Sequence, residues 1–166
     1  ASSDYPLRDV YKRQLIGGGR GPAYPYISLA KAVDRLDLLR QNNMGRVTAP
    51  PLAFYKALGF QGETGPSRQT LSALNQYGLI EYVGRGDNRN VRLSSLAQRI
   101  IFDKIPNSVE RAEALREAAL LPIIFGKLWE AGYRPPLAPD YVLETFLVRD
   151  NGYNEASALN VVNVYK

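Results

Sequence analysis

The sequence predicts a mainly α-helical protein with a small β-hairpin, arranged as a winged helix-turn-helix followed by a helical C-terminal region. Apolar residues recur at helical spacing along most of the chain, and prolines or glycines separate many of these segments. One stretch, residues 80–93, instead alternates apolar and polar residues around a glycine-containing turn, as half-buried hairpins do. This hairpin follows a helix with one polar face. Such an order of elements is the sequence outline of a winged helix-turn-helix, in which that helix enters the major groove of DNA.

The composition excludes several classes of protein. The chain has 166 residues, of which 45% are hydrophobic, so it can form the core of one ordinary domain or two small ones. It contains no cysteine and no histidine. Disulfide scaffolds, cysteine nucleophiles, histidine acid–base catalysis and Cys/His zinc sites are therefore excluded. No apolar run approaches the ~18 residues of a membrane helix. The start also lacks the pattern of a signal peptide, so we expect a soluble, cytoplasmic protein.

The positive charge is concentrated in one part of the chain. The formal net charge is +5 at pH 7. Residues 15–103 carry 11 Lys and Arg against 6 Asp and Glu, whereas residues 104–166 carry 7 against 8. The cationic excess coincides with the predicted winged helix, as expected for a domain that faces phosphate groups. This distribution favours double-stranded DNA as the partner.

Residues 1–21 are assigned no native role. Residues 9–14 read DVYKRQ, which matches the in-frame translation of a transposon adapter used in DNA library preparation. We interpret this segment as a non-native sequencing scar, and the alternative is a disordered basic arm. Residues 17–21 read GGGRG and lack the Gly-Lys-Ser/Thr ending of a phosphate-binding loop, so they are interpreted as a flexible linker.

The predicted winged helix-turn-helix domain occupies residues 22–103. Residues that favour helix starts, such as Ser28, precede its helices, and a glycine follows each of the first three. The compact spacing allows these elements to share one core. The predicted helices span residues 28–44, 50–58, 66–77 and 94–103, and the hairpin turn, or wing, spans residues 84–92.

The helix predicted over residues 66–77, the candidate recognition helix, separates apolar from polar side chains. Leu71, Leu74 and Gly78 fall on one face. Gln69, Ser72, Ala73 and Gln76 fall roughly opposite, with Arg68 on the flank. Glutamine can pair with adenine and arginine with guanine, which favours base contacts, although a merely solvated helix face is the alternative. The predicted DNA-binding residues of this helix are Arg68, Gln69, Ser72 and Gln76.

The predicted wing is rich in arginine. Three arginines lie within eight residues, beside glycine and two asparagines. Like charges on a tight turn repel one another unless an anion neutralises them, which favours contact with phosphate. The alternative is a solvated turn in which Asp87 is the internal counter-charge. The predicted DNA-binding residues of the wing are Arg85, Asn88, Arg89 and Arg92.

Residues 104–166 predict a helical C-terminal region. Ser108 and Asn154 are placed to cap its first and last helices, and three prolines between 135 and 139 indicate a loop. The last helix reaches Lys166 without a glycine or proline stop, so we expect this region to be truncated. Its helices are the predicted surface for a homodimer or a protein partner.

No set of residues predicts catalysis. Asp140 and Glu144 lie four apart on one face of the helix predicted over residues 140–148, but the helix dipole and solvent exposure account for such a pair. No lysine is placed to complete a nuclease-like set of two acids and a lysine. We therefore expect no enzyme activity, no catalytic residue, no cofactor and no metal site.

Three short motifs carry a resemblance to a known family. They are Tyr24-Pro25-Tyr26, Leu58-Gly59-Phe60, and the series Leu71, Leu74, Gly78 and Leu79. In these motifs the chain resembles an uncharacterised prokaryotic winged-helix family, described as a domain of unknown function. The resemblance covers residues 24–166 and implies the fold more than an activity. The wing of this chain is longer and richer in arginine than is usual in such families.

Two functions remain as expectations from the sequence. The first is a DNA-binding winged-helix protein that acts as a transcriptional regulator or accessory factor. The second is a winged-helix protein–protein interaction module that does not bind DNA. Binding to a duplex that weakens steeply with salt would distinguish the first from the second.

Overall fold

The computed structural model describes residues 21–166, so the scar and nearly all of the linker predicted over residues 1–21 lie outside the described residues. The protein is mainly helical with one small two-stranded antiparallel sheet, as predicted. The chain divides into two compact units, with the divisions between Tyr24 and Pro25 and between Gly126 and Lys127. Among the described helices, none is long and apolar enough to cross a membrane.

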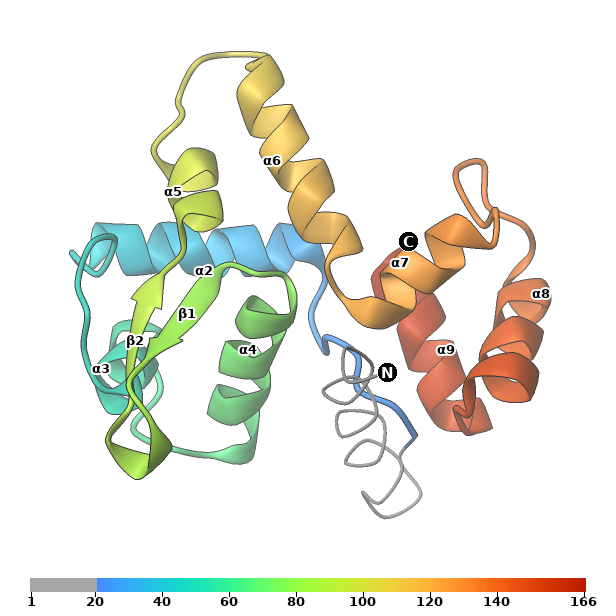
Figure 1. The fold of residues 1–166 in the computed structure, drawn as a ribbon, viewed down its shortest axis with the longest axis horizontal. Helices are drawn as coiled ribbons and strands as arrows, with labels where there is room; N and C mark the ends of the chain where they lie inside the picture. Colours follow the sequence, from blue (N-terminus) through green and yellow to red (C-terminus); the bar gives the residue numbers. More distant parts are fainter. Residues whose placement is uncertain (1–20) are drawn as a thin grey trace, which may run out of the picture. The chain divides into compact units, whose positions relative to one another are not determined.

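The unit formed by residues 25–126 contains the predicted helices and hairpin in the predicted order (Figure 1). Serine side chains begin two of its helices: the Ser28 hydroxyl accepts a hydrogen bond from Lys31 N at 3.3 Å, and the Ser94 hydroxyl accepts one from Ala97 N at 3.1 Å. The elements are α2 (Leu29–Gln41), α3 (Pro51–Ala57), α4 (Gly65–Gln76), β1 (Ile80–Val83), β2 (Asn90–Leu93), α5 (Ser95–Ile101) and α6 (Val109–Leu120).

The hairpin has the register that its alternating sequence predicts. Ile80 pairs with Leu93 and Tyr82 with Val91, and a short 3₁₀ turn, η2 (Gly86–Asn88), joins the strands. Ile80, Val91 and Leu93 are buried in the core, whereas Tyr82 is only partly buried. Ala49 adds a bridge that the sequence did not reveal. It exchanges two backbone hydrogen bonds with Val91, at 3.0 and 2.7 Å. The hairpin is therefore held at its middle by the segment that precedes α3.

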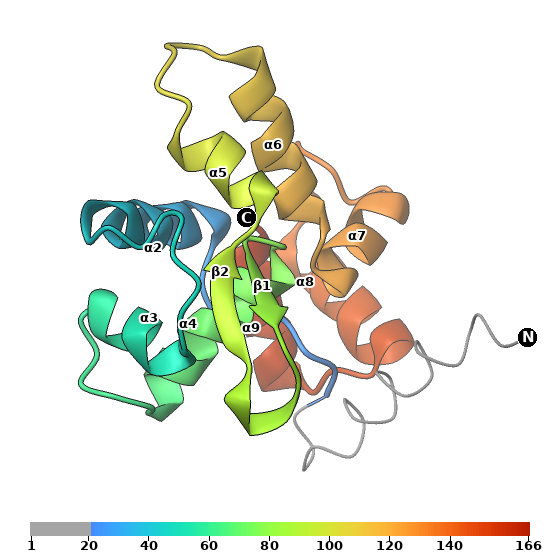
Figure 2. The ribbon, with the colours of Figure 1, turned by 60° about the vertical axis from the view of Figure 1, so that its left-hand side comes forward.

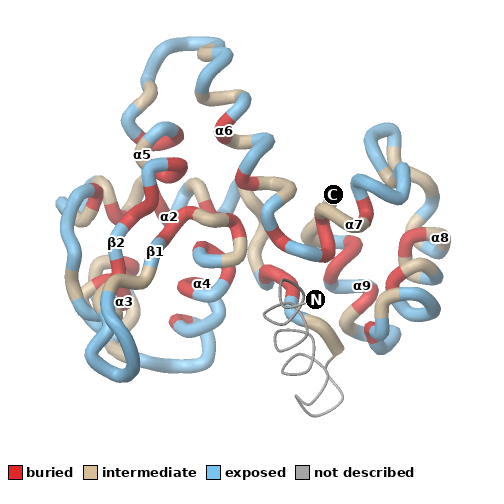
Figure 3. The backbone as a smooth tube through the Cα atoms, in the orientation of Figure 1, coloured by how far each residue is buried: buried red, intermediate tan, exposed pale blue. Residues whose placement is uncertain are grey.

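The core of this unit joins the helices to the inner face of the hairpin (Figure 3). Tyr77 closes it at the end of α4, where its hydroxyl donates a hydrogen bond to Ile27 O at 2.8 Å. Burial raises the pKa of Tyr77 well above its ordinary value. The fully buried side chains include Leu36, Leu39, Phe54, Leu71, Leu74, Tyr77, Leu79, Val91 and Ile100.

The division of the chain differs from the predicted boundary at Asp103, because α6 packs on α5 within the first unit. Arg111 Nε donates to Ile100 O at 3.1 Å, and Arg99 pairs with Glu117 at 3.2 Å. Alanines on the inner side of α6 are fully buried. The loop at residues 102–107 resembles a domain boundary because it contains polar residues and a proline. The buried side of α6 nevertheless packs on α5, so α6 belongs to the same unit as the helices before it.

The second unit consists of the chain from Lys127 onward and a short segment that ends at Tyr24. The Tyr153 hydroxyl donates to Ala23 O at 3.1 Å, and the Tyr24 and Tyr153 rings meet edge to face at 6.2 Å. The helix predicted over residues 140–148 is an α-helix that continues as a π-helical turn. The elements are α7 (Ile123–Glu130), which begins in the first unit, α8 (Asp140–Thr145), η3 (Phe146–Asp150) and α9 (Glu155–Tyr165).

Candidate nucleic-acid interface

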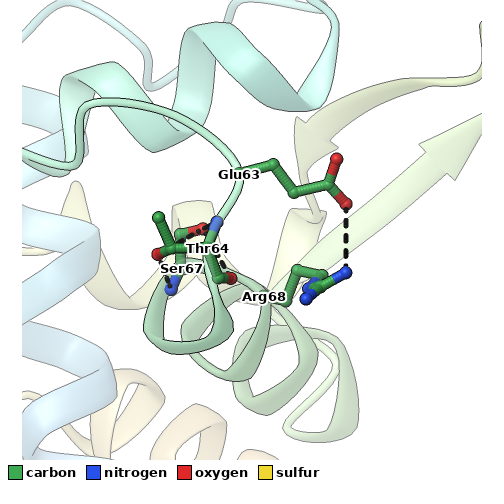
Figure 4. A network of polar contacts seen from close by, with 4 residues as sticks. All are labelled: Glu63, Thr64, Ser67 and Arg68. Carbon is green, nitrogen blue, oxygen red and sulfur yellow. Dashed lines mark hydrogen bonds and ion pairs between the residues drawn. The ribbon is translucent and has the colours of Figure 1, made fainter.

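The start of α4 is held by a reciprocal pair of hydrogen bonds (Figure 4). The Thr64 hydroxyl accepts from Ser67 N at 3.2 Å, and the Ser67 hydroxyl accepts from Thr64 N at 2.7 Å. Pro66 occupies the first turn, where a backbone N–H would have no partner within the helix, so proline loses no hydrogen bond there. This capping box determines where the helix begins and hence the direction in which its first exposed side chains point.

The exposed side of α4 carries most of the residues predicted to contact DNA. Arg68, Gln69 and Ser72 are exposed. Gln76 is partly buried, and its Nε2 donates to the Ser72 hydroxyl at 3.1 Å. The prediction that Ala73 shares this side is wrong, because Ala73 is fully buried. Both α2 and β1 pack on α4, so its buried surface is wider than the Leu71–Leu74 stripe.

The arginines of the hairpin have different environments. Arg89 lies over the Tyr82 ring, with its guanidinium carbon 3.8 Å from the ring centroid. Arg92 Nε lies 2.9 Å from Glu81 Oε2. Arg85 is exposed and forms no ion pair with any residue of the range 21–166. Glu81 is therefore the internal counter-charge of this hairpin, a role for which the sequence had suggested Asp87.

The hairpin turn and the start of α4 lie at the same end of the unit formed by residues 25–126 (Figures 1 and 2). The turn and the loop that precedes α4 line a groove of about 730 Å³, to which α4 itself contributes no residue. The loop before α4 supplies Glu63, the turn supplies Asp87 and Arg89, and α3 supplies Tyr55. Burial and the Glu63 carboxylate raise the pKa of Tyr55, while the charges of Arg68 and Arg89 act in the opposite direction. Side chains from both predicted contact segments therefore surround Tyr55.

Carboxylates reduce the positive charge of this end. Arg68 Nη1 lies 3.9 Å from Glu63 Oε1, and both side chains are more than 60% exposed (Figure 4). With the Glu81–Arg92 pair and Asp87, three carboxylates accompany the four arginines that the sequence identified. An ion pair between exposed side chains is weak, so Arg68 and Arg92 can exchange their carboxylates for another anion.

The structure brings together some predicted residues and separates others. Arg68, Arg85 and Arg89 belong to the segments that meet at this end, as do Gln69 and Asn88. Gln76 is the last residue of α4 and lies at the opposite end of that helix. The sequence interpretation missed Tyr55 and Glu63. Tyr55 lies in the helix predicted over residues 50–58 but was not among the predicted site residues, and no motif marks Glu63.

Asp140 and Glu144, the acidic pair considered for catalysis, both lie in α8 but differ in their contacts. Asp140 forms an ion pair with Lys166 at 2.7 Å. Its predicted partner Glu144 has no ion pair among residues 21–166. Within that same range, no group of three or more acidic residues could hold a metal ion.

Comparison with protein-family models gives no match for this chain, and neither the curated proteins nor the solved structures contain a significant match.

Proposed function

We propose that residues 25–126 form a winged helix-turn-helix domain that binds double-stranded DNA. In this proposal α4 enters the major groove and the turn between β1 and β2 contacts the phosphate backbone. The observation that supports it is the placement of the exposed start of α4 and the arginine-bearing turn at the same end of this unit. The proposed role is that of a transcriptional regulator or accessory factor.

The side chains of α4 suit limited base readout. Arg68 can reach guanine or a phosphate, and Gln69 can pair with adenine through two hydrogen bonds. Ser72 lies one turn further along the same exposed side and can donate to or accept from a base edge. Because Gln76 is partly buried at the far end of α4, we assign it a supporting contact to Ser72 rather than a base.

The turn between the strands suits phosphate contact. Arg85 is exposed without an ion pair in the described part of the chain, and Arg89 is oriented by the Tyr82 ring. A protein that neutralises two or three phosphates should show a slope of about −2 to −3 when log K is plotted against log salt concentration. The carboxylates at this end limit the number of phosphates, so a larger slope is not expected.

The C-terminal unit is the proposed surface for a homodimer or a protein partner. Large apolar side chains are exposed on it: Tyr141 is 70% exposed and Leu159 is 46% exposed. Exposed apolar groups of this size are suited to contacts between proteins. Two bound copies would read two half-sites of a duplex.

The test is a salt titration of the whole chain against a fluorescently labelled duplex of roughly 25 base pairs, followed by anisotropy. Arg85→Ala and Arg89→Ala should each reduce the slope by about one. Arg116→Ala is the matched control, because Arg116 is exposed on α6, away from the hairpin turn (Figures 1 and 2). Equal effects of all three substitutions would contradict a specific DNA surface.

A protein-interaction module is the second candidate. The observation that favours it is the mixed charge of the surface, where Glu63, Glu81 and Asp87 lie among the arginines. Such a surface can pair with acidic and basic groups of a protein partner. Absence of anisotropy change at low salt, with a correctly folded chain, would support this candidate and exclude the first.

A further inference from the structure

The groove between α3 and the hairpin is large enough for a small ligand. Its volume of about 730 Å³ falls within the range of small-molecule sites. Pro50, Pro51 and Leu52 form its apolar wall, and Tyr55 and Tyr82 contribute aromatic rings. The charged groups that line it are two carboxylates and one guanidinium, so its own lining carries an excess of negative charge.

Two tyrosine hydroxyls in this groove have no hydrogen-bond partner among residues 21–166. Tyr55 is only 6% exposed, yet its hydroxyl forms no hydrogen bond with any residue of the range 21–166. The hydroxyl of Tyr82 is likewise without a hydrogen-bond partner in the described chain. Neither hydroxyl is among the described side-chain atoms that are both fully buried and unpartnered, so both reach solvent and can form a hydrogen bond with a molecule in the groove.

One contact within the protein indicates which chemical groups suit the groove. The Arg89 guanidinium stacks on Tyr82 at 3.8 Å from the ring centroid. Planar cations are attracted to the face of an aromatic ring, and guanidinium groups stack there readily. The carboxylates of Glu63 and Asp87 line the same groove. Arg89 thus occupies part of a site whose ring faces and charges favour a planar cation.

We propose that this groove binds a small planar organic cation of the guanidinium or amidinium class, which replaces the Arg89 guanidinium on the Tyr82 ring. The cation is sandwiched against the ring, its N–H groups donate to the Tyr55 hydroxyl, and Glu63 or Asp87 neutralises its charge. The apolar wall contacts the hydrocarbon part of the ligand. Arg89 turns out towards solvent when the ligand is present.

The test uses benzamidine as the probe, titrated into the whole chain in the absence of DNA and followed by NMR signals of the tyrosine rings. Benzamidine should shift the signals of Tyr55 and Tyr82, assigned by replacing each with phenylalanine. Benzamide, which is nearly isosteric but uncharged, should bind at least about threefold more weakly, because the ring face and the carboxylates favour a cation.

Two substitutions in the groove should change the affinity for benzamidine in opposite directions. Arg89→Ala should strengthen benzamidine binding about threefold, because the competing guanidinium and its charge are removed. Tyr82→Leu should weaken binding at least threefold. Arg85→Ala is the matched control: it removes the same charge from the same turn but no contact with Tyr82, so its effect should be smaller than that of Arg89→Ala.

Either of two results would overturn the proposal: equal binding of benzamide and benzamidine, or unchanged or weaker benzamidine binding in Arg89→Ala. Loss of a fold cannot produce stronger binding, and the comparison of the two probes needs no substitution at all. The titration contains no DNA, so a chain that binds benzamidine but no duplex would contradict the proposed function alone. A chain that binds the duplex but not benzamidine would contradict this inference alone.

Discussion

Arg92 and Glu81 are direct partners across the β1–β2 hairpin, and Arg92 Nε lies 2.9 Å from Glu81 Oε2. Opposite charges facing each other on neighbouring strands stabilise the pair. Both side chains are about half exposed, so water screens the attraction and the pair is weak. In the absence of DNA, Arg92 is therefore paired with the Glu81 carboxylate, and a phosphate must compete with that carboxylate for it.

This competition gives a prediction about charge at the proposed DNA surface. Glu81→Gln should strengthen binding to the duplex about twofold to fivefold at low salt, because Arg92 then lacks its internal counter-charge. The difference should shrink as salt is added, since the effect is electrostatic. Anisotropy titrations at two salt concentrations would measure it.

The control for this substitution is Glu113→Gln, which removes the same charge from the exposed side of α6. Removing a distant carboxylate changes the net charge by the same amount but not the field at the hairpin. If Glu113→Gln strengthens binding as much as Glu81→Gln, only the net charge of the protein matters and the assigned surface is wrong.

The capping box at the start of α4 gives a prediction about stability. Thr64→Ala removes the side-chain acceptor for Ser67 N and should lower the free energy of unfolding by about 1 kcal/mol. Ser67→Ala should lower it by a similar amount, because the Thr64 N–H loses its acceptor. The double variant should be less destabilised than the sum, since the two residues form one motif. Urea unfolding followed by circular dichroism measures these differences.

Ser95→Ala is the control for the capping prediction. Ser95 is exposed at the first position of α5, and the hydroxyl that caps that helix belongs to Ser94. Its replacement should change stability by less than about 0.5 kcal/mol. A loss at Ser95 as large as the loss at Thr64 would show that the reciprocal hydrogen bonds have no special importance.

Local sequence signals predicted the elements well, whereas contacts between distant segments escaped them. Ser28 and Ser94 are recognisable caps because helix capping depends on a few neighbouring residues. The Ala49–Val91 bridge depends on a pairing across 42 positions, and no local pattern marks it. Ala73 was misplaced because the width of a buried helix face is set by the number of neighbours that pack on it.

The candidate site shows the same limit. Composition and spacing identified the arginines of the hairpin, because charges that lie close together along the chain can be recognised from the sequence alone. The partners of those arginines were not visible. Glu81 faces Arg92 only through the strand register, and Tyr82 receives Arg89 only because the turn folds back on its strand. Which charges are free for a ligand is therefore a property of the folded hairpin.

Tyr77 gives a prediction about pH. Burial raises its pKa above the ordinary value of 10.0, so the folded state favours the protonated phenol. The stabilisation that this raised pKa gives the folded state is fully present below about pH 10. It is lost as the pH rises further, because the phenol of Tyr77 loses its proton at a lower pH in the unfolded state than in the folded state. Urea unfolding between pH 8 and pH 11 should show this alkaline loss.

Tyr77→Phe separates the titration from the packing. At neutral pH the substitution should lower stability by about 1 kcal/mol, because Ile27 O loses the hydrogen bond from the hydroxyl. Above pH 10 the variant should lose less stability than the unaltered chain, although other tyrosines with raised pKa values still contribute to the loss. Parallel alkaline curves for the two proteins would contradict the assignment to Tyr77.

Gly78, which follows α4, gives a prediction that also tests the contact of Leu121 with the turn after α4. Its φ of +70° strains any other residue except asparagine, and a Cβ there would lie 2.5 Å from Leu121 Cδ1 at the end of α6. Leu121 is 47% exposed and the end of its side chain can turn away, so Gly78→Ala should lower stability only slightly more than Gly86→Ala, whose φ of +67° is similar but whose Cβ would meet nothing within 4 Å. This difference between the two losses of stability should decrease when Leu121→Ala is added, because that substitution removes the colliding atom. If Leu121→Ala leaves this difference unchanged, the contact of Leu121 with the turn after α4 does not contribute to it.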